Sequence, residues 1–402
     1  MRMIRAVAIM LALTVTITLV GCVSYVDLSD RAIVQAIGID YLPDKKVYRI
    51  SMQYFNQSSE GGQNQIDKTQ DNVLKSVGEG ESIFEAAKNA SMLTGKDLLL
   101  SENRLIIIGK ELRKYKLGDT LEFFVGNYHS HPQAYVAAAE DTAEELLDIR
   151  FKEGSTSSQR LANLIHNASV ESRNKSTYPY QVMTMLCTST ESAFLPLLTT
   201  ATLKTDVTIP KETGGGKGNG GGEEQSEDGE KTIILDGGVV FKGGKELCRV
   251  DDDGAMAIFF MNDMPSEYSF TVPLGQNAKP SVMLIGVTRS IKATEYNGKV
   301  KFDVSFSASG KIGSKGGMKE DDKKAAEKVA EPAERELKRK IESSMIPIAE
   351  KGCDVFGLEN TLRRCCNRFY RENMDRVEEI IAESEIEVNV NIDIFSQGIG
   401  GA

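Results

Sequence analysis

One segment of the chain cannot contribute to any hydrophobic core. Residues 211–231 are all glycine, charged or other polar residues, with Gly-Gly-Gly runs at 214–216 and 220–222. Such a segment buries too little apolar surface to offset the entropy of ordering it, so we expect a flexible linker. A phosphate-binding loop is the alternative, but Lys217 is followed by Gly218 rather than by Ser or Thr. We therefore expect separate folded units on either side.

A chain of 402 residues is too long for one ordinary core, so we expect more than one domain. Composition shifts around this linker indicate where the boundaries lie. The fold class that we expect is α+β and multidomain, with mixed and antiparallel sheets and helices packed on one face. The predicted segments are a leader at 1–21, an N-terminal α/β domain at 22–200, a strand and flexible linker at 201–231, a small β-rich middle domain at 232–280 and a C-terminal α+β domain at 281–402.

Strands and helices alternate in the N-terminal domain. Capping boxes that begin at Ser82 and Thr142 predict two helix N-termini. Pro43 and Asp44 supply turn chemistry between the first two strands. Strands are predicted in this part at residues 32–40, 47–54, 105–108 and 133–139.

An acidic run interrupts the middle domain. The sequence Asp251-Asp252-Asp253-Gly254 suggests a calcium loop, but it lacks the ligand alternation of an EF-hand. We expect a solvated turn there, followed by a short apolar strand at 255–260. Two further strands are predicted at residues 232–241 and 246–250.

The C-terminal domain has the clearest periodic patterns. Asn297-Gly298 predicts a type I′ turn between two strands, and apolar alternation in 386–394 predicts a strand buried on one face. Pro332, inside a charged helical pattern, either kinks that helix or begins a second one. Helices are predicted in this part at residues 320–342 and 358–381.

The N-terminus has the layout of a secretory leader that ends at Cys22. Arg2 and Arg5 precede an apolar run at 6–20, and Gly21 stands just before the cysteine. Cysteine at the cleavage point resembles a bacterial lipobox, in which the sulfur receives a diacylglyceryl group. An ordinary signal peptide and a single spanning helix are the alternatives, although the run is short for a span of about 20 residues. We expect lipidation, with the mature body outside the cytoplasmic membrane.

Charge and cysteine usage exclude several classes of function. The chain has 48 Lys and Arg against 58 Asp and Glu, a net charge of −10, which disfavours nucleic acid as a partner. An odd number of cysteines follows Cys22, and this argues against a disulfide framework. Buried or half-exposed thiols are expected, and the state of each is left open for Cys187, Cys248, Cys353, Cys365 and Cys366.

Residues that carry catalysis are sparse. The histidines are His129, His131 and His166, and no nearby acid or cysteine completes a metal site around the first two. No nucleophile elbow, Ser-x-x-Lys or His-Glu-x-x-His motif occurs. We therefore predict a non-catalytic protein without cofactor or metal.

Several blocks of sequence resemble the spore germination lipoprotein family Ger(x)C, the C subunit of nutrient germinant receptors. The lipobox cysteine is one of them, and the chain departs from the family in having no tryptophan. The other similar blocks are residues 32–40, 82–86, 100–112, 142–147, 238–242 and 353–358 followed by 362–364.

The resemblance implies a non-enzymatic subunit on the outer face of the spore inner membrane, built from mixed α/β domains. It implies an integral-membrane A subunit and a transporter-like B subunit as partners, and lipid attachment at Cys22. It assigns no ligand-binding residues, so direct binding of a nutrient is left open. In the block at 353–358, we expect Gly357 to permit a turn and Phe356 to pack, with Asp354 in the same structural motif.

A lipid-anchored solute-binding protein of a membrane transporter is the alternative function. That class holds its ligand between two α/β lobes whose strands are mostly parallel and continuously apolar. The alternating strands that the sequence predicts argue against it.

Overall fold

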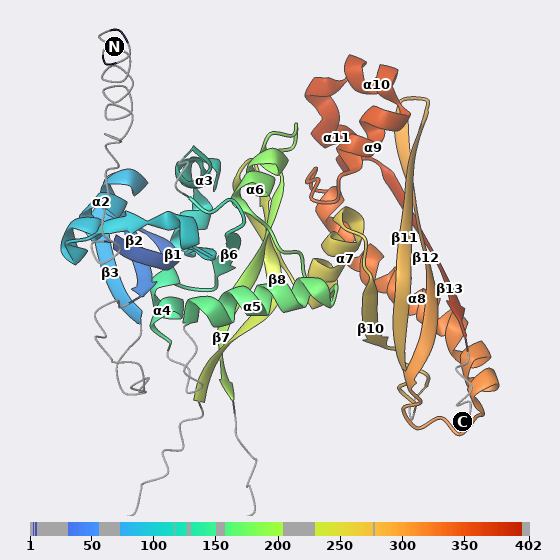
Figure 1. Ribbon diagram of the computed structural model, residues 1–402. Helices are drawn as coiled ribbons and strands as arrows, with labels where there is room; N and C mark the ends of the chain where they lie inside the picture. Colours follow the sequence, from blue (N-terminus) through green and yellow to red (C-terminus); the bar gives the residue numbers. More distant parts are fainter. Residues whose placement is uncertain are drawn as a thin grey trace, which may run out of the picture.

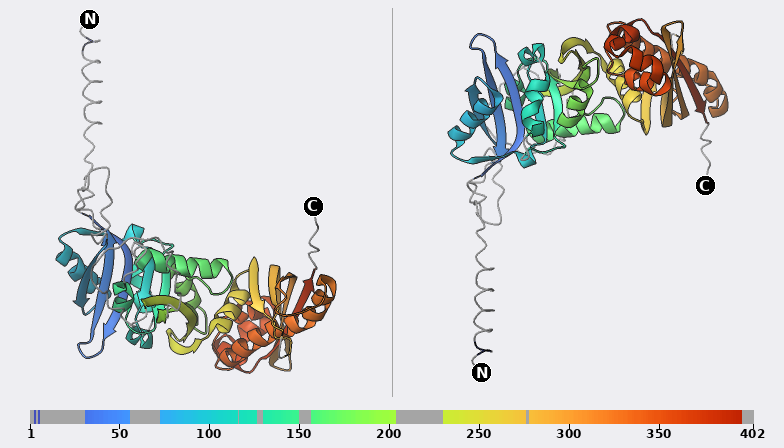
Figure 2. Two further views of the ribbon diagram at one scale, coloured as in Figure 1. Left: turned by 90° about the horizontal axis from the view of Figure 1, so that it is seen from below. Right: turned by 90° about the horizontal axis from the view of Figure 1, so that it is seen from above.

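The computed structural model describes residues 3, 5, 31–55, 73–115, 117–126, 130–149, 157–203, 230–275 and 278–395. These residues form two sheets at opposite ends of an elongated body (Figures 1 and 2). Cys22, His129 and the expected linker at 211–229 lie outside the described residues. Within the described part, no helix combines the length and the apolar character that a bilayer crossing requires.

The first sheet has nine strands in the order β3-β2-β1-β5-β6-β7-β8-β9, with β4 beside β1. Its centre, β1-β5-β6-β7, is parallel, as is the short pairing of β4 with β1, and the remaining strand pairs are antiparallel. The strands are β1 (Arg31–Leu42), β2 (Val47–Phe55), β3 (Val73–Gly80), β4 (Asp97–Leu99), β5 (Leu105–Ile108), β6 (Tyr135–Ala139), β7 (Ala193–Leu203), β8 (Glu230–Lys242) and β9 (Lys245–Val250).

Helices cover both faces of this sheet, where the sequence analysis expected one face. Ile106 and Ile108 of β5 contribute to the core on one face, and Leu105 and Ile107 contribute to the core on the other. The first face carries α2 (Ile83–Thr94), α3 (Leu117–Gly126) and α6 (Pro179–Leu186), and the second carries α4 (Ala143–Asp148) and α5 (Ser157–Val170). Two short 3₁₀ helices, η2 (Leu100–Glu102) and η3 (Glu111–Lys114), connect these elements.

The expected boundary in the middle of the chain falls inside one antiparallel strand pair. Strand β7 pairs with β8 from Ala193↔Phe241 to Leu203↔Glu230, so the residues between these strands interrupt a hairpin of the first sheet. Residues 232–280 do not stay together as a small β-rich unit. They supply β8 and β9 to the first sheet, then helix α7, then the edge strand of the second sheet.

The predicted strand at 255–260 is wrong, because this segment is part of helix α7 (Asp252–Asn262). The Asp251 carboxylate caps the helix by accepting the N–H of Gly254 at 2.9 Å. Asp252 and Asp253 lie in the first turn, where the helix dipole favours negative charge. The acidic run is therefore a helix N-terminus rather than a solvated turn.

The second sheet has the order β10-β11-β12-β13. Asn297 and Gly298 both have positive φ in the β11–β12 turn, which confirms the predicted hairpin. Its strands are β10 (Glu267–Thr271), β11 (Ser281–Tyr296), β12 (Lys299–Ser314) and β13 (Glu385–Ile394).

Helices lie on one face of the second sheet. The long helix α8 (Asp322–Ala349) continues through Pro332. The single helix expected at 358–381 is instead divided into α9 (Leu358–Cys365), α10 (Asn367–Glu372), the 3₁₀ turn η4 (Met374–Arg376) and α11 (Val377–Ala382).

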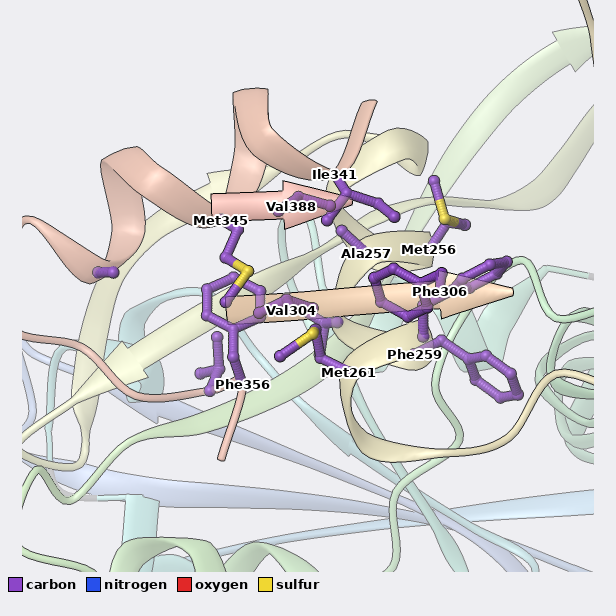
Figure 3. Packing of buried hydrophobic residues seen from close by; sticks show 14 of the residues in the cluster. Met256, Ala257, Phe259, Met261, Val304, Phe306, Ile341, Met345, Phe356 and Val388 are labelled. Carbon is purple, nitrogen blue, oxygen red and sulfur yellow. The ribbon is translucent and has the colours of Figure 1, made fainter. Parts of the chain in front are cut away.

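The largest hydrophobic cluster of the described residues joins the two sheets. It contains Phe194 of β7 and Val240 of β8, the apolar residues of α7, and the helix-covered face of the second sheet. Figure 3 shows Met256 and Met261 of α7 together with Val304 and Phe306 of β12 in this core. Helix α7 is therefore the element through which the two sheets share one interior.

We predict that Gly237→Ala destabilises the chain more than Gly243→Ala. Both glycines have left-handed φ, 57° and 58°, so each substitution pays about 1 kcal/mol of backbone strain. A Cβ on Gly237 would lie 1.9 Å from the Val250 carbonyl oxygen, whereas one on Gly243 meets no atom within 4 Å. The extra loss in the free energy of unfolding should be about 1–3 kcal/mol, measured by urea unfolding. Equal losses would contradict this account of the β8–α7 connection.

Candidate functional site

The predicted lipidation site, Cys22, lies outside the described residues and stays a prediction. The first described strand begins at Arg31, nine positions after Cys22. The sequence between them therefore sets the longest distance between the first sheet and a lipid attached to that cysteine.

The described histidines serve as hydrogen-bonding groups. His131 Nδ1 accepts the N–H of Gln133 at 3.1 Å, and His166 Nδ1 lies 3.1 Å from the Tyr135 hydroxyl. Among the described residues, no group of three or more His, Cys, Asp or Glu side chains is placed to hold a metal ion.

The five cysteines of the described body are free thiols. Burial raises the pKa of Cys353 to about 12, and its Sγ donates to the Phe241 carbonyl oxygen at 3.6 Å. Burial also raises the pKa values of Cys248 and Cys366. Reactive cysteines need an accessible thiolate, and these three environments disfavour it.

A group of buried hydrogen bonds lies where the two sheets meet, around residues 353–358. These residues are here called the junction turn. The buried Asp354 carboxylate accepts the N–H groups of Leu358 and Glu359, each at 2.7 Å, and so caps α9. Gly357 has φ 76°, and Phe356 is 1% exposed. The structural roles predicted for these three residues are confirmed.

The junction turn also bonds to the first sheet. The Asp354 N–H donates to Ser192 Oγ at 3.0 Å, and Cys353 donates to Phe241 in β8. Beside the turn, Lys242 at the end of β8 donates to the Lys351 carbonyl oxygen at 2.8 Å. The turn therefore connects two parts of the chain that lie more than a hundred residues apart.

Glu359 makes a second connection between the same two parts. Its carboxylate, 7% exposed, accepts the N–H and the Oγ of Ser189 at 3.1 and 2.7 Å. It also accepts the hydroxyl of Tyr370 at 2.9 Å. The oxygen atoms of both carboxylates thus accept hydrogen bonds from within the protein.

Desolvation has the largest effect on the pKa of Asp354 in the junction turn. Burial raises the pKa of Asp354 to about 6, although the hydrogen bonds from the Glu359 and Leu358 N–H groups oppose the rise. The Asp354 carboxylate thus fixes the junction turn to the start of α9, and the Asp354 N–H and the Glu359 carboxylate make the hydrogen bonds to the segment before β7. Sequence reasoning identified Asp354, but it missed Ser189, Ser192 and Glu359, because no local pattern marks a partner so distant along the chain.

A groove lies between α2 and α3 on the first sheet. Its volume is about 660 Å³ and its apolar lining includes Phe84 and Phe123. Glu81, Asp119 and Glu122 also line it, with no basic side chain among the lining residues. The groove therefore combines three carboxylates with two phenyl rings.

Two family models match most of the chain. One, described as the spore germination protein N-terminal domain, matches residues 24–200. The other, described as spore germination B3/GerAC like, C-terminal, matches residues 236–398. The chain belongs to the Ger(x)C spore germination family. This family comprises the C subunits of germinant receptors.

Two individual proteins are similar to this family member. A crystal structure of the GerBC protein superimposes with a TM-score of 0.50 at 13% identity, covering 89% of this chain and 96% of that one, which supports the same fold. Spore germination protein KC of Bacillus subtilis (strain 168) is 31% identical over 149 residues. That match covers 35% of this chain and 35% of the relative, so it spans about a third of the relative's length.

The pH dependence of stability tests the junction turn. Between the ordinary pKa of 3.8 and the folded value of about 6, the native Asp354 holds a proton that the unfolded chain has lost. The free energy of unfolding of the wild type relative to Asp354→Asn should therefore fall by about 2 kcal/mol as the pH rises from 4 to 6. Urea unfolding at several pH values measures this difference.

The exposed Asp375 supplies the control for this measurement. Asp375→Asn should give a stability profile parallel to that of the wild type across the same pH range. A parallel profile for Asp354→Asn as well would mean that Asp354 is not the buried acid described here.

Proposed function

We propose that this chain is the lipid-anchored C subunit of a nutrient germinant receptor. In this proposal it acts with an integral-membrane A subunit and a transporter-like B subunit to trigger germination, without catalysing a reaction. Family membership across both sheets supports the proposal.

The anchor in this proposal is a diacylglyceryl group on Cys22, at the end of the apolar leader. Burial of acyl chains contributes about 0.8 kcal/mol per methylene, and two or more chains hold a protein stably on a bilayer. The body would then lie on the outer face of the cytoplasmic membrane, which is the inner membrane of the spore. Confinement there raises its effective concentration near membrane-embedded partners.

The observation that carries the proposal is the buried connection between the two sheets, which consists of α7 and the junction turn. Helix α7 and the junction turn fix one sheet relative to the other through a shared core and buried hydrogen bonds. A contact at one end of the molecule can therefore constrain the other end. This is the property that a coupling subunit between membrane partners needs.

The solute-binding alternative shares one feature with this chain, the parallel centre of the first sheet. Such proteins bind their ligand in a cleft between two lobes. Here the corresponding region is filled by α7, whose residues from Gly254 to Met261 are all buried. The filled junction favours the receptor-subunit function over ligand capture at this position.

Germination of spores that carry Cys22→Ala tests the proposal. We expect these spores to lose their response to one class of nutrient, as spores lacking the chain do, because the untethered protein leaves the membrane. Both should still germinate with a non-nutrient trigger. Cys187→Ala, which changes an exposed cysteine of the body, is the matched control and should behave as wild type. Membrane fractionation measures the displacement directly.

Normal nutrient responses from Cys22→Ala spores, with the protein displaced from the membrane, would contradict the tether. Calorimetry of the full chain with nutrient mixtures distinguishes the alternative function. A solute-binding protein should release or absorb heat on binding a nutrient, with a dissociation constant in the micromolar range. The proposed coupling role does not require such binding.

A further inference from the structure

The end of helix α2 lies beside the beginning of β1, at the edge of the first sheet that is formed by strand ends rather than by an outermost strand. Strand β4, which starts three residues after α2 ends, pairs in parallel with β1 in the register Arg31↔Asp97. Strand β3 begins at this edge too, because Leu74 pairs with Tyr54 near the end of β2. Figure 1 shows α2 on the side of the molecule away from the second sheet.

Three large apolar side chains are exposed at this edge. Met92 and Leu93, in the last turn of α2, are 67% and 75% exposed, and Leu74 of β3 is 39% exposed. The buried face of the helix is formed by Ile83 and three alanines. Met92 and Leu93 are therefore not needed for packing α2 on its own sheet, and here they are called the α2 tip.

The α2 tip is flanked by positive charge in a chain whose net charge is −10. Lys88 lies one turn before Met92 on the helix, Lys96 follows the helix end, and Arg31 neighbours Asp97 across the strand pair. Among the ion pairs of the described residues, none involves these three cations. Asp97 adds one negative charge between Lys96 and Arg31. Exposed apolar side chains with an excess of Lys and Arg beside them match the surface of a bilayer that contains anionic lipids.

The length of the preceding chain brings this edge close to the membrane. Cys22 stands nine residues before Arg31, and nine extended residues span at most about 30 Å. The edge that carries the α2 tip is therefore the part of the described body that a lipid on Cys22 holds nearest to the bilayer.

We propose that the α2 tip inserts into the lipid bilayer and forms a second membrane contact beside the lipid anchor. The proposal rests on the anchor at Cys22 and adds to it the face of the body that meets the membrane. A lipid tether alone leaves the orientation of the body free, whereas a tether and a contact at the same edge fix it. The second sheet is then presented in a constant direction to membrane-embedded partners.

The absence of tryptophan in the chain provides a specific test. Leu93→Trp places a single tryptophan in the α2 tip, and Tyr296→Trp places one at an equally exposed position, 76%, in the second sheet. Each full-length lipidated chain is reconstituted into vesicles of phosphatidylethanolamine and phosphatidylglycerol. Brominated acyl chains in a parallel set of vesicles quench tryptophan that enters the hydrocarbon.

We expect the emission of Leu93→Trp to shift to the blue in vesicles and to lose at least half of its intensity with brominated lipid. The emission of Tyr296→Trp should change little. Adding Lys88→Glu and Lys96→Glu to Leu93→Trp should reduce the quenching in these anionic vesicles, because both substitutions place negative charge beside the headgroups.

The other outcomes separate the tip from the anchor. If the vesicles float with the protein but Leu93→Trp is not quenched, the tip proposal is overturned and the anchor stands. A blue shift without quenching means that protein, such as a second copy of the chain, covers the tip, and this also overturns the proposal. If the full chain fails to float with vesicles, the anchor and the tip proposal fall together.

Discussion

The burial of α7 between the two sheets is the constraint on which the rest of the structure depends. Met256, Ile258, Phe260 and Met261 are each at most 2% exposed, and full burial of a side chain of this size stabilises by about 1.5–3 kcal/mol. A helix that is apolar on all sides must have partners all around it. The first sheet, through Phe194 and Val240, and the helix-covered face of the second sheet supply those partners, so this core draws on both sheets.

The polar contacts of the junction make this packing specific. Buried apolar surfaces tolerate small rotations, whereas the hydrogen bonds from Ser189 to Glu359 and from the Asp354 N–H to Ser192 Oγ fix one arrangement. The Asp354 carboxylate would be costly to bury without the N–H groups of Leu358 and Glu359, and the Glu359 carboxylate without Ser189 and Tyr370. In a receptor subunit built in this way, a displacement of one sheet would also move the other. A membrane contact at the α2 tip would fix the orientation of both sheets relative to the bilayer.

Local patterns in the sequence were reliable where a short segment determines its own conformation. The capping boxes at Ser82 and Thr142, the Asn297-Gly298 turn and the last strand are all found where they were predicted. Helix α7 was missed because a short, continuously apolar run fits a buried strand and a buried helix equally well, although the acidic run before it is a helix N-terminal signal. The β7–β8 pair was missed because the composition of a segment predicts a linker but does not indicate that the strands on either side of the linker pair with each other. Lipidation at Cys22 stays a prediction from the leader.

Native-state hydrogen exchange of the full lipidated chain in increasing urea tests most directly whether the two sheets form one cooperative unit. Mass spectrometry would follow peptides from β5 in the first sheet and from β12 in the second. If α7 and the junction turn join the sheets as described, both peptides should lose protection with the same free energy and the same dependence on urea. Opening of β12 at a lower free energy, while β5 stays protected, would contradict the account.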